Sequence, residues 1–261
     1  MTYQNIGSSK VAVVLPAYNC VGTISRAIDS IINQTYQNWV LYVIEDCSTD
    51  LTFSYISDKY LDPRIKIFKN DINLGVSETR NKGINLSSED YICFIDSDDE
   101  WLPSKLDKQL NKIDAGYNII ITDYDYINRN GARTLVSYCK DYMSSDDFLK
   151  KKYRVCFSSI MIHNRKKVMF KKIGHEDFMF INEVLADNGH LYIIREKLVN
   201  YYESVNSLSS NKIKTITWQF KLLLDIFPKR IDKVIIYFFY YILNAIRFQR
   251  KIKNDKNINF N

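Results

Sequence analysis

The chain has 261 residues, of which 46% are hydrophobic and 25% are charged, and this globular composition excludes an intrinsically disordered protein. Its net charge of +6 is uneven, since residues 1–120 carry 11 Lys/Arg against 16 Asp/Glu and residues 205–261 carry 11 Lys/Arg against 3 Asp. Five scattered cysteines without a Cys-x-x-Cys spacing argue against a disulfide framework or zinc site, and the longest apolar run, Val234 to Leu243, is too short to span a bilayer.

Strand-like and helix-like segments alternate over the first 120 residues. We predict strands at Val11–Leu15, Trp39–Ile44, Ile65–Phe68, Tyr91–Ile95 and Tyr117–Thr122. We predict helices at Thr23–Ile32, from Thr49 or Asp50 to Tyr60, at 78–87 with Ser77 as the cap, and from Pro103 to Asp114. Because the strands are apolar throughout and separated by helices, the sequence predicts an α/β fold with a Rossmann-like, parallel or mixed central sheet flanked by helices.

The pattern changes after residue 123. Two strands, Tyr124–Ile127 and Thr134–Tyr138, flank a hairpin turn at Asn130-Gly131, and a further strand is predicted at Val155–Ile162. A helix is predicted at Glu176–Asp187. From Lys212 the chain reads as helical with a break at Phe227-Pro228, and we expect its last nine residues to be frayed.

Polar clusters follow three of the predicted strands at their carboxyl ends. They are Pro16-Ala17-Tyr18-Asn19, Glu45-Asp46, and Asp96-Ser97-Asp98-Asp99. Any one cluster could be a solvated turn. Together they predict one site, because ligands of open parallel sheets bind beyond the carboxyl ends of the strands.

The third cluster lies in the stretch YICFIDSDDEW, where four acids occupy five positions and need a positive partner. Oxygen ligands without a nearby His or Cys favour Mg²⁺ or Mn²⁺, whose shell is usually completed by phosphates. Such an ion would neutralise charge on a phosphate leaving group. The alternative is an acidic helix start ahead of Pro103, which explains one or two of the acids.

Five motifs occur in an order that resembles the nucleotide-sugar-dependent glycosyltransferases of family 2. They are VAVVLPAYN, the acidic end of VIEDCSTD, NLGVSETRNKGI, FIDSDDEW and GHEDF, and the resemblance covers roughly residues 10–205. It implies a GT-A fold and metal-dependent, inverting transfer of a hexose or N-acetylhexosamine from a UDP-sugar. The implied acceptor is a glycan or a polyprenyl-diphosphate-linked glycan of bacterial surface-polysaccharide synthesis. The implied catalytic domain is 1–210, with a nucleotide-binding half at about 10–123, an acceptor-binding half at about 124–210, and a basic aromatic helical tail at 211–261.

The resemblance also implies roles for the donor-side residues. Pro16, Ala17, Tyr18 and Asn19 would line the nucleoside pocket, Asp46 would bind the base, Arg80 would lie near the diphosphate, Asp96 and Ser97 would contact the donor, and Asp98 would bind Mn²⁺ or Mg²⁺. Asp99 would touch the sugar or a metal-bound water. Arg80 could instead be an ordinary exposed helix residue. Trp101 could stack on a sugar or pack beside Leu102, and Glu100 could cap the next helix.

On the acceptor side, Glu176 and Asp177 resemble the family's acidic pair, with Asp177 as the general base. The alternative is that either acid caps its helix. His175 and His190 are interpreted as structural. Many relatives have Tyr-Arg-x-His-x-x-Ser after this helix, whereas this chain has YYESVNSLS, with Tyr202 in place of Arg and Ser204 in place of His. The resemblance then leaves Asp98 as the one firm protein ligand of the metal.

The tail, KRIDKVIIYFFYYILNAIRFQRKIK at 229–253, places aromatic and aliphatic residues between Lys/Arg clusters. This pattern favours an interfacial helix on an anionic membrane. The alternative is a helix packed on the catalytic domain or on a dimer partner, and no recognised nucleic-acid module accompanies the tail. The N-terminus lacks a signal-peptide pattern, so we expect a cytoplasmic protein at the inner face of the cell membrane.

Two other functions are open from the sequence. A phosphohydrolase would use Asp96 as nucleophile and Asp98 as acid, although such enzymes usually follow the second Asp with Gly-Thr. A non-catalytic membrane-docking subunit would retain nucleotide binding alone. Residues 124–175 show no pattern that identifies the donor sugar, the acceptor or the linkage.

Overall fold

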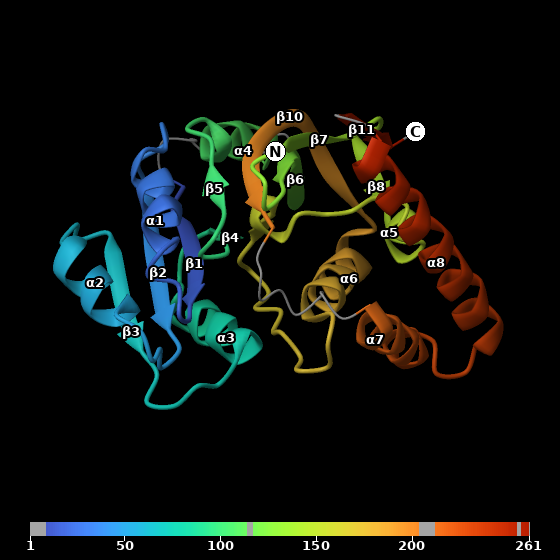
Figure 1. The fold of residues 1–261 in the computed structure, drawn as a ribbon, viewed down its shortest axis with the longest axis horizontal. Coiled ribbons are helices and arrows are strands. Elements are labelled where there is room, and N and C mark those ends of the chain that lie inside the picture. The colour runs from blue at the N-terminus through green and yellow to red at the C-terminus, as the bar shows by residue number, and fades with distance from the viewer. Residues whose placement is uncertain (1–8, 114–116, 204–211, 255–256, 261) are drawn as a thin grey trace.

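The computed structural model describes residues 9–113, 117–203, 212–254 and 257–260 and contains one mixed sheet flanked by helices (Figure 1). The sheet runs in the order β11-β7-β6-β9-β4-β1-β2-β3. Its strands are β1 (Val11–Ala17), β2 (Trp39–Glu45), β3 (Ile65–Lys69), β4 (Tyr91–Phe94), β6 (Ile119–Ile127), β7 (Arg133–Tyr138), β9 (Met161–His163) and β11 (Asn257–Phe260). Strands β1 to β4 are parallel, and β9 joins β4 to β6 antiparallel.

A further strand, β10 (His190–Tyr202), lies beside β6 in parallel and pairs antiparallel with the short strands β5 (Glu100–Trp101) and β8 (Tyr142–Ser144). The helices are α1 (Ile24–Ile32), α2 (Thr52–Lys59), α3 (Val76–Leu86), α4 (Lys105–Ile113), α5 (Ser145–Leu149), α6 (Glu176–Asn188), α7 (Lys212–Ile226) and α8 (Ile231–Asn254). In Figure 1, α2 and β3 lie at one end of the molecule and α8 lies at the other.

The parallel strands are buried because both of their faces are covered, as their unbroken apolar sequence predicts. Every residue from Val11 to Leu15 is fully buried. Gly83 of α3 allows that helix to lie directly on β1, since a Cβ there would come within 2.5 Å of Val14 Cγ1. The five cysteines are free, and Cys93 is a buried core residue.

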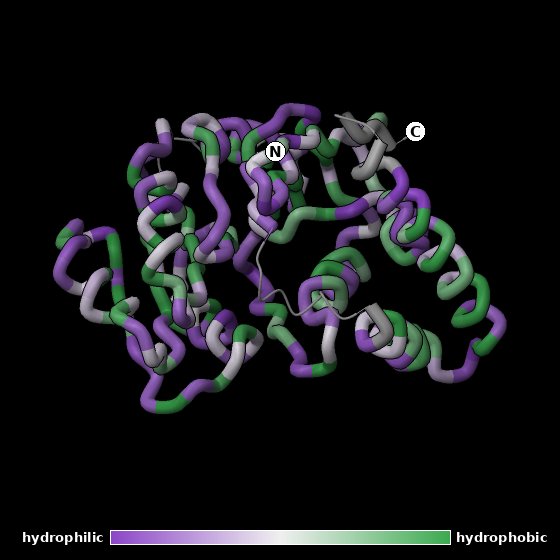
Figure 2. Tube along the Cα trace, viewed as in Figure 1, coloured by the Kyte–Doolittle hydropathy of each residue, from purple (hydrophilic) through white to green (hydrophobic). Residues whose placement is uncertain are grey.

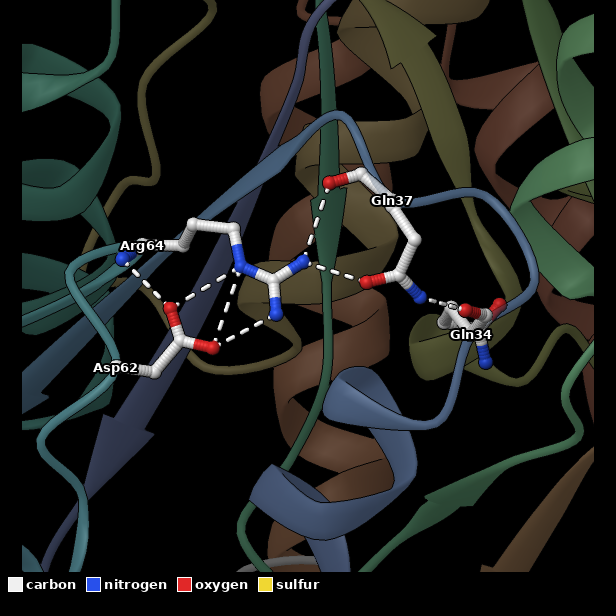
Figure 3. Close-up of polar contacts among 4 residues, drawn as sticks. All are labelled: Gln34, Gln37, Asp62 and Arg64. Carbon is white, nitrogen blue, oxygen red and sulfur yellow. Dashed lines mark hydrogen bonds and ion pairs between the residues drawn. The ribbon is translucent and has the colours of Figure 1, made fainter.

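A polar cluster ties β2 and β3 together at the edge of the sheet opposite their carboxyl ends (Figure 3). Arg64 precedes β3 and donates to Asp62 Oδ2 at 2.7 Å and to Gln37 Oε1 at 2.6 Å. Gln37 precedes β2, and its side chain donates in turn to the carbonyl of Gln34. These bonds fix the starts of β2 and β3, and the other end of β2 carries the cluster Glu45-Asp46.

Several predicted boundaries are wrong for identifiable reasons. The two strands predicted on either side of Asp123 form one continuous strand, β6, because Asp123 Oδ1 accepts from Tyr138 N at 3.1 Å and this acid is tolerated inside the sheet. The strand predicted at Val155–Ile162 is instead a 3₁₀ turn at Phe157–Ser159 followed by β9. The expected frayed C-terminus contains β11, which pairs with β7 in parallel.

Helix α3 begins at Val76 with Gly75 as its N-cap, so the predicted cap, Ser77, lies inside the helix.

The C-terminal helices pack on the rest of the chain. Tyr237 OH of α8 donates to Asp146 Oδ1 at 2.9 Å, and Asn244 Nδ2 donates to the Lys150 carbonyl at 3.0 Å. Apolar segments recur along both helices (Figure 2), but among the described residues no helix is long and apolar enough to cross a membrane. The predicted domain boundary at residue 210 lies outside the described residues.

Candidate active site

A cavity of about 1380 Å³ opens at the carboxyl ends of β1, β2 and β4 and extends to α6 and the C-terminal helices. Every site residue predicted from the sequence lines this cavity except Asp99 and Trp101, which are buried beside it. The prediction that the three polar clusters meet at one edge of the sheet is therefore confirmed.

The first cluster is shaped by Asn19, which has the left-handed φ of 46°. Its Oδ1 accepts from Thr49 N at 2.8 Å and Asp50 N at 3.3 Å, and its own N–H donates to Ser48 Oγ at 3.0 Å. Asn19 thus joins the ends of β1 and β2. Tyr18, which precedes it, is 48% exposed and is free to contact a ligand in the cavity.

Asp46 is 3% exposed and organises the turn before α3. Its Oδ1 accepts from Asn70 Nδ2 at 2.8 Å and from Leu74 N at 2.9 Å, and its Oδ2 accepts from Gly75 N at 2.8 Å. A carboxylate has about four acceptor positions, so roughly one remains for a ligand. The sequence did not show this second, structural use of Asp46.

Arg80 joins the acidic cluster after β4 to α6. Its Nη2 donates to Asp96 Oδ1 at 2.6 Å, and its Nη1 donates to Asp177 Oδ1. The guanidinium also lies 4.6 Å from the ring centre of Phe157 and 5.2 Å from that of Phe170. Its side chain is 4% exposed, so the alternative of an exposed helix residue is wrong.

The charges around Arg80 decide its protonation. Burial alone would lower the pKa of Arg80, but the charges of Asp177 and Asp96 raise it above the usual value. The guanidinium therefore stays charged and holds the two carboxylates on opposite sides of itself, which fixes their positions relative to each other.

Asp98 is an acid of the cluster that lines the cavity and has little compensation for its charge. Burial raises its pKa to about 6, the charge of Asp96 adds to this effect, and Arg26 opposes it. The Arg26 side chain donates to the backbone carbonyl of Asp98 at 2.5 Å and also lies 3.5 Å from the ring centre of Tyr202. Among the residues that the structure describes, no Lys or Arg forms an ion pair with the Asp98 carboxylate.

The remaining acids of the cluster hold strands together. Asp99 is fully buried, where its Oδ2 accepts from Ser158 Oγ at 2.5 Å and its Oδ1 accepts from Tyr202 N at 3.1 Å. Glu100 lies in β5 and accepts from Asn200 Nδ2 at 2.7 Å. The predicted contact of Asp99 with sugar and the predicted capping role of Glu100 are therefore replaced by contacts to β10 and its surroundings.

Trp101 is 2% exposed, and its Nε1 donates to the Ser158 carbonyl at 2.8 Å. Lys105 Nζ lies 3.9 Å from its ring centre. Of the two interpretations of Trp101, packing is the one that this burial supports, because a ring that stacks on a sugar must be accessible.

Helix α6 presents Glu176 and Asp177 in its first turn. The N-cap residue is His175, at φ 54° and without a side-chain cap bond, so the alternative that one of the acids is the cap is wrong. The Asp177 side chain is 46% exposed in the cavity. Although the side chain is open to the cavity, the protein around it desolvates the carboxylate and raises its pKa, and the charge of Arg80 opposes this rise. A carboxylate with a raised pKa is a stronger base.

The part of the chain that the structure describes contains no group of three His, Cys, Asp or Glu side chains arranged to hold a metal ion. The Nε2 atom of His175 is 3.0 Å from the Thr215 carbonyl, so this nitrogen is engaged by the backbone. Ser204, which occupies the position of the family's downstream His, lies outside the described residues. A divalent ion would therefore need ligands from a bound substrate in addition to Asp98.

Comparisons with known proteins agree with this geometry. The model of "Glycosyl transferase family 2" matches residues 12–176. Two Escherichia coli relatives, WfgD and WfaP, are named UDP-Glc:alpha-D-GlcNAc-diphosphoundecaprenol beta-1,3-glucosyltransferases. WfgD is 29% identical over 90% of this chain and 92% of its own length, and WfaP is 28% identical over 95% and 98%.

Solved structures show the same fold at lower identity. Residues 1–349 of S. aureus TarS in complex with UDP-GlcNAc align with a TM-score of 0.68 at 15% identity, over 84% of this chain and 66% of that one. The same fragment without a named ligand aligns at 0.68 over 93% and 73%. Together with the family match, the sheet and its flanking helices establish that the chain belongs to glycosyl transferase family 2 and has a GT-A-like fold.

Proposed function

We propose that this glycosyltransferase moves a hexose, with glucose as the first choice, from a UDP-sugar to a glycan carried on a lipid diphosphate. The observation that carries the proposal is the bridge formed by Arg80, which holds a donor-side acid, Asp96, and a base-side acid, Asp177, in one cavity. The names of the two E. coli relatives support the choice of UDP-glucose and of a lipid-diphosphate acceptor.

On the donor side, the residues from Pro16 to Asn19 would contact the nucleoside, and the remaining acceptor position of Asp46 would bind the base. Asp98 fits a divalent ion, because its carboxylate is partly buried beside Asp96 and has no ion-pair partner among the described side chains. A bound Mn²⁺ or Mg²⁺ would supply charge neutralisation for the donor diphosphate. The protein offers one firm ligand in Asp98, with Asp96 beside it.

The chemical step requires one base on the acceptor side. Asp177 would take the proton from the acceptor hydroxyl as its oxygen bonds to the anomeric carbon of the donor. The bond from that carbon to the diphosphate oxygen breaks, UDP leaves with the electron pair, and the configuration inverts. A positioned general base typically contributes ~10²–10⁴-fold to such a rate.

The C-terminal helices support a location at the inner face of the cell membrane, because α8 exposes large apolar side chains. Ile231, Ile235, Ile236 and Phe239 are each at least half exposed, and Lys and Arg residues flank them in the sequence. A helix with this pattern suits the surface of an anionic bilayer, which is also where a lipid-linked acceptor resides.

Membership of a glycosyltransferase family favours sugar transfer over the alternative of an aspartate-based phosphohydrolase. The ion pair of Asp96 with Arg80 also gives this acid a positioning role in place of the nucleophilic one. A non-catalytic, nucleotide-binding subunit remains the second candidate, and only turnover measurements distinguish it.

The test is transfer from UDP-glucose, UDP-galactose and UDP-N-acetylglucosamine to an undecyl-diphosphate-linked α-GlcNAc acceptor with Mn²⁺. We expect product with one donor, and a fall of about 10²–10⁴-fold in kcat for Asp177→Asn. Glu176→Gln is the matched control, because it removes a neighbouring acid without removing the base. Full turnover by Asp177→Asn would contradict the proposed base, and UDP binding without any product would favour the non-catalytic subunit.

A further inference from the structure

The end of the cavity beside α8 is called the acceptor end here. It contains two cations, Lys151 and Arg154, on the segment that follows α5. Lys151 Nζ lies 4.5 Å from the ring centre of Tyr241, and the Arg154 guanidinium lies 4.7 Å from that of Phe248, so both cations lie against the inner face of α8. This end of the cavity therefore has a basic and aromatic wall, in contrast to the acidic wall on the donor side.

Neither cation has a carboxylate partner within the described part of the chain. The neighbouring Lys152, by comparison, is 4.0 Å from Asp147 and does not line the cavity. Two cations that face a cavity without counter-charges repel each other, and this arrangement is stabilised when an anion binds between them.

The backbone at Lys151 has a conformation that lysine rarely adopts. Lys151 has a left-handed φ of 49°. Its N–H donates to the Phe148 carbonyl at 2.8 Å, and Lys152 N–H donates to the Asp147 carbonyl at 3.1 Å, which together form the turn that ends α5. Gly or Asn is the usual residue at such a position, because a Cβ there costs energy. A lysine therefore stands at a position where the backbone favours Gly or Asn.

Burial and mutual repulsion shift the protonation of the groups in this cluster. Burial lowers the pKa of Lys151 to about 7, and Arg154 lowers it further. Burial also lowers the pKa of His175 to about 4, with the charges of Lys151 and Arg154 adding to the effect. A ligand with several negatively charged oxygens would reverse these shifts for Lys151.

The position of this pair matches a lipid-linked substrate. Both cations act on the charge of His175, which precedes the proposed base, Asp177, by two residues, so the pair lies near the start of α6 as well as against α8. The face of α8 that lines the cavity includes Tyr241 and Phe248, whereas Ile235 and Phe239 on the other side of the helix are 60% exposed. A ligand bound here would have its sugar near Asp177 and its lipid near the apolar surface of the helix.

We propose that Lys151 and Arg154 bind the diphosphate of the lipid-linked acceptor. The identity of the acceptor rests on the proposed function, but the binding of an isoprenyl diphosphate by this cluster does not. Arg154 is well placed for such a role because its carbonyl accepts from Tyr124 OH at 3.1 Å and from Tyr138 OH at 2.7 Å, which fixes the backbone beneath its side chain.

The experiment measures the binding of farnesyl diphosphate to the full chain by calorimetry in EDTA, so that no divalent ion contributes. The variants are Lys151→Asn, which suits the left-handed backbone, and Arg154→Gln, with Lys152→Gln as the control. Each site variant should raise Kd about tenfold, as expected for the loss of one charged hydrogen bond, and the control should stay within about twofold. Thermal unfolding establishes that all three variants are folded.

Binding of the donor diphosphate or of lipid headgroup phosphates by this cluster would give different results. If the cluster serves the donor, UDP affinity in Mn²⁺ will fall by the same factor as the affinity for farnesyl diphosphate. If it serves lipid headgroups, the variants will lose binding to phosphatidylglycerol vesicles, relative to phosphatidylcholine, without a change for farnesyl diphosphate. Either of these results would overturn the proposal. It would also be overturned if both site variants bind farnesyl diphosphate as tightly as the unaltered chain, or if the unaltered chain does not bind it. Absence of sugar transfer would instead count against the proposed function, because this binding assay needs no turnover.

Discussion

Replacing Asp98 by asparagine should make the metal-free protein more stable while it abolishes metal-dependent donor binding. Asp98 is partly buried beside Asp96, and it forms no ion pair among the described residues. Its charge is therefore a cost to the folded state that a bound cation would offset. The asparagine side chain would keep nearly the same shape without the charge, so the cost should disappear.

The size of this effect follows from the pKa of Asp98. Burial and the charge of Asp96 raise this pKa from 3.8 to about 6, and a shift of roughly two units corresponds to about 3 kcal/mol. Partial exposure of the carboxylate lowers the figure, so we expect a gain of about 1–3 kcal/mol at pH 7. For a chain of this length the melting temperature should rise by roughly 3–10 °C.

The change of stability with pH follows from the direction of this pKa shift. A carboxyl whose pKa is raised in the folded state destabilises it fully above pH 6, and the penalty is lost as pH falls from 6 toward 4. The stability difference between Asp98→Asn and the unaltered chain should therefore be largest at pH 7 to 8 and vanish near pH 4. Saturating UDP with Mn²⁺ should reverse the order, because ligand at 1,000 times its Kd stabilises by about 4.1 kcal/mol and should act on the unaltered chain alone.

The assay is chemical and thermal unfolding in EDTA across this pH range, followed by titration with UDP and Mn²⁺. Asp46→Asn is the matched control. Its carboxylate accepts from Gly75 N, Leu74 N and Asn70 Nδ2, so its loss should destabilise by about 1–3 kcal/mol at pH 7. If Asp98→Asn is less stable than the unaltered chain in EDTA at pH 7, or if the difference does not change with pH, the electrostatic reasoning fails.

Two further substitutions test the parts that position the base. Arg80→Lys should lower kcat/KM about 10²-fold, because an ammonium cannot hold both carboxylates in the planar fork seen here; steady-state kinetics within twofold of the unaltered enzyme would show that the fork is not needed. Gly174→Ala should destabilise the fold by about 2–4 kcal/mol in urea unfolding, since φ is +74° and the new Cβ would lie 2.3 Å from Trp218 Cδ2. Gly189→Ala is the control, because Gly189 has a φ of +75° and no neighbour within 4 Å, so its loss of stability should come from the backbone conformation alone. If both substitutions lower the free energy of unfolding equally, the contact with Trp218 contributes nothing.

The parallel half of the sheet could be predicted because its strands are buried on both faces and are apolar without interruption. Strand β10 could not, although it is the longest strand that the structure describes. It contains Arg195-Glu196-Lys197 at an irregularity in its pairing with β6, and these side chains are exposed. A charged triplet in mid-sequence is typical of a loop, and only the neighbouring strand shows that it belongs to a sheet.

The donor side of the site could be predicted because its residues follow strands, where chain order and sheet geometry place them together. The residues that came from elsewhere were missed. Arg26 lies on α1, Phe157 in a 3₁₀ turn, and Lys151 and Arg154 in a segment without any recognisable motif. The presence of Phe157, Lys151 and Arg154 in the cavity depends on how the second half of the chain folds back over the first, and local sequence does not specify this.

The two halves of the cavity differ in charge, and this difference predicts whether each half needs a divalent ion to bind a diphosphate. In the proposed arrangement, a donor diphosphate would face Asp96 and Asp98 and would need a divalent ion to neutralise its charge, whereas an acceptor diphosphate would face Lys151 and Arg154. Chelation by EDTA should therefore abolish UDP binding while farnesyl diphosphate binds with unchanged affinity, as measured by calorimetry before and after chelation. Loss of both affinities on chelation would mean that one metal-dependent subsite receives both ligands, and the division of the cavity into an acidic donor side and a basic acceptor side would then be wrong.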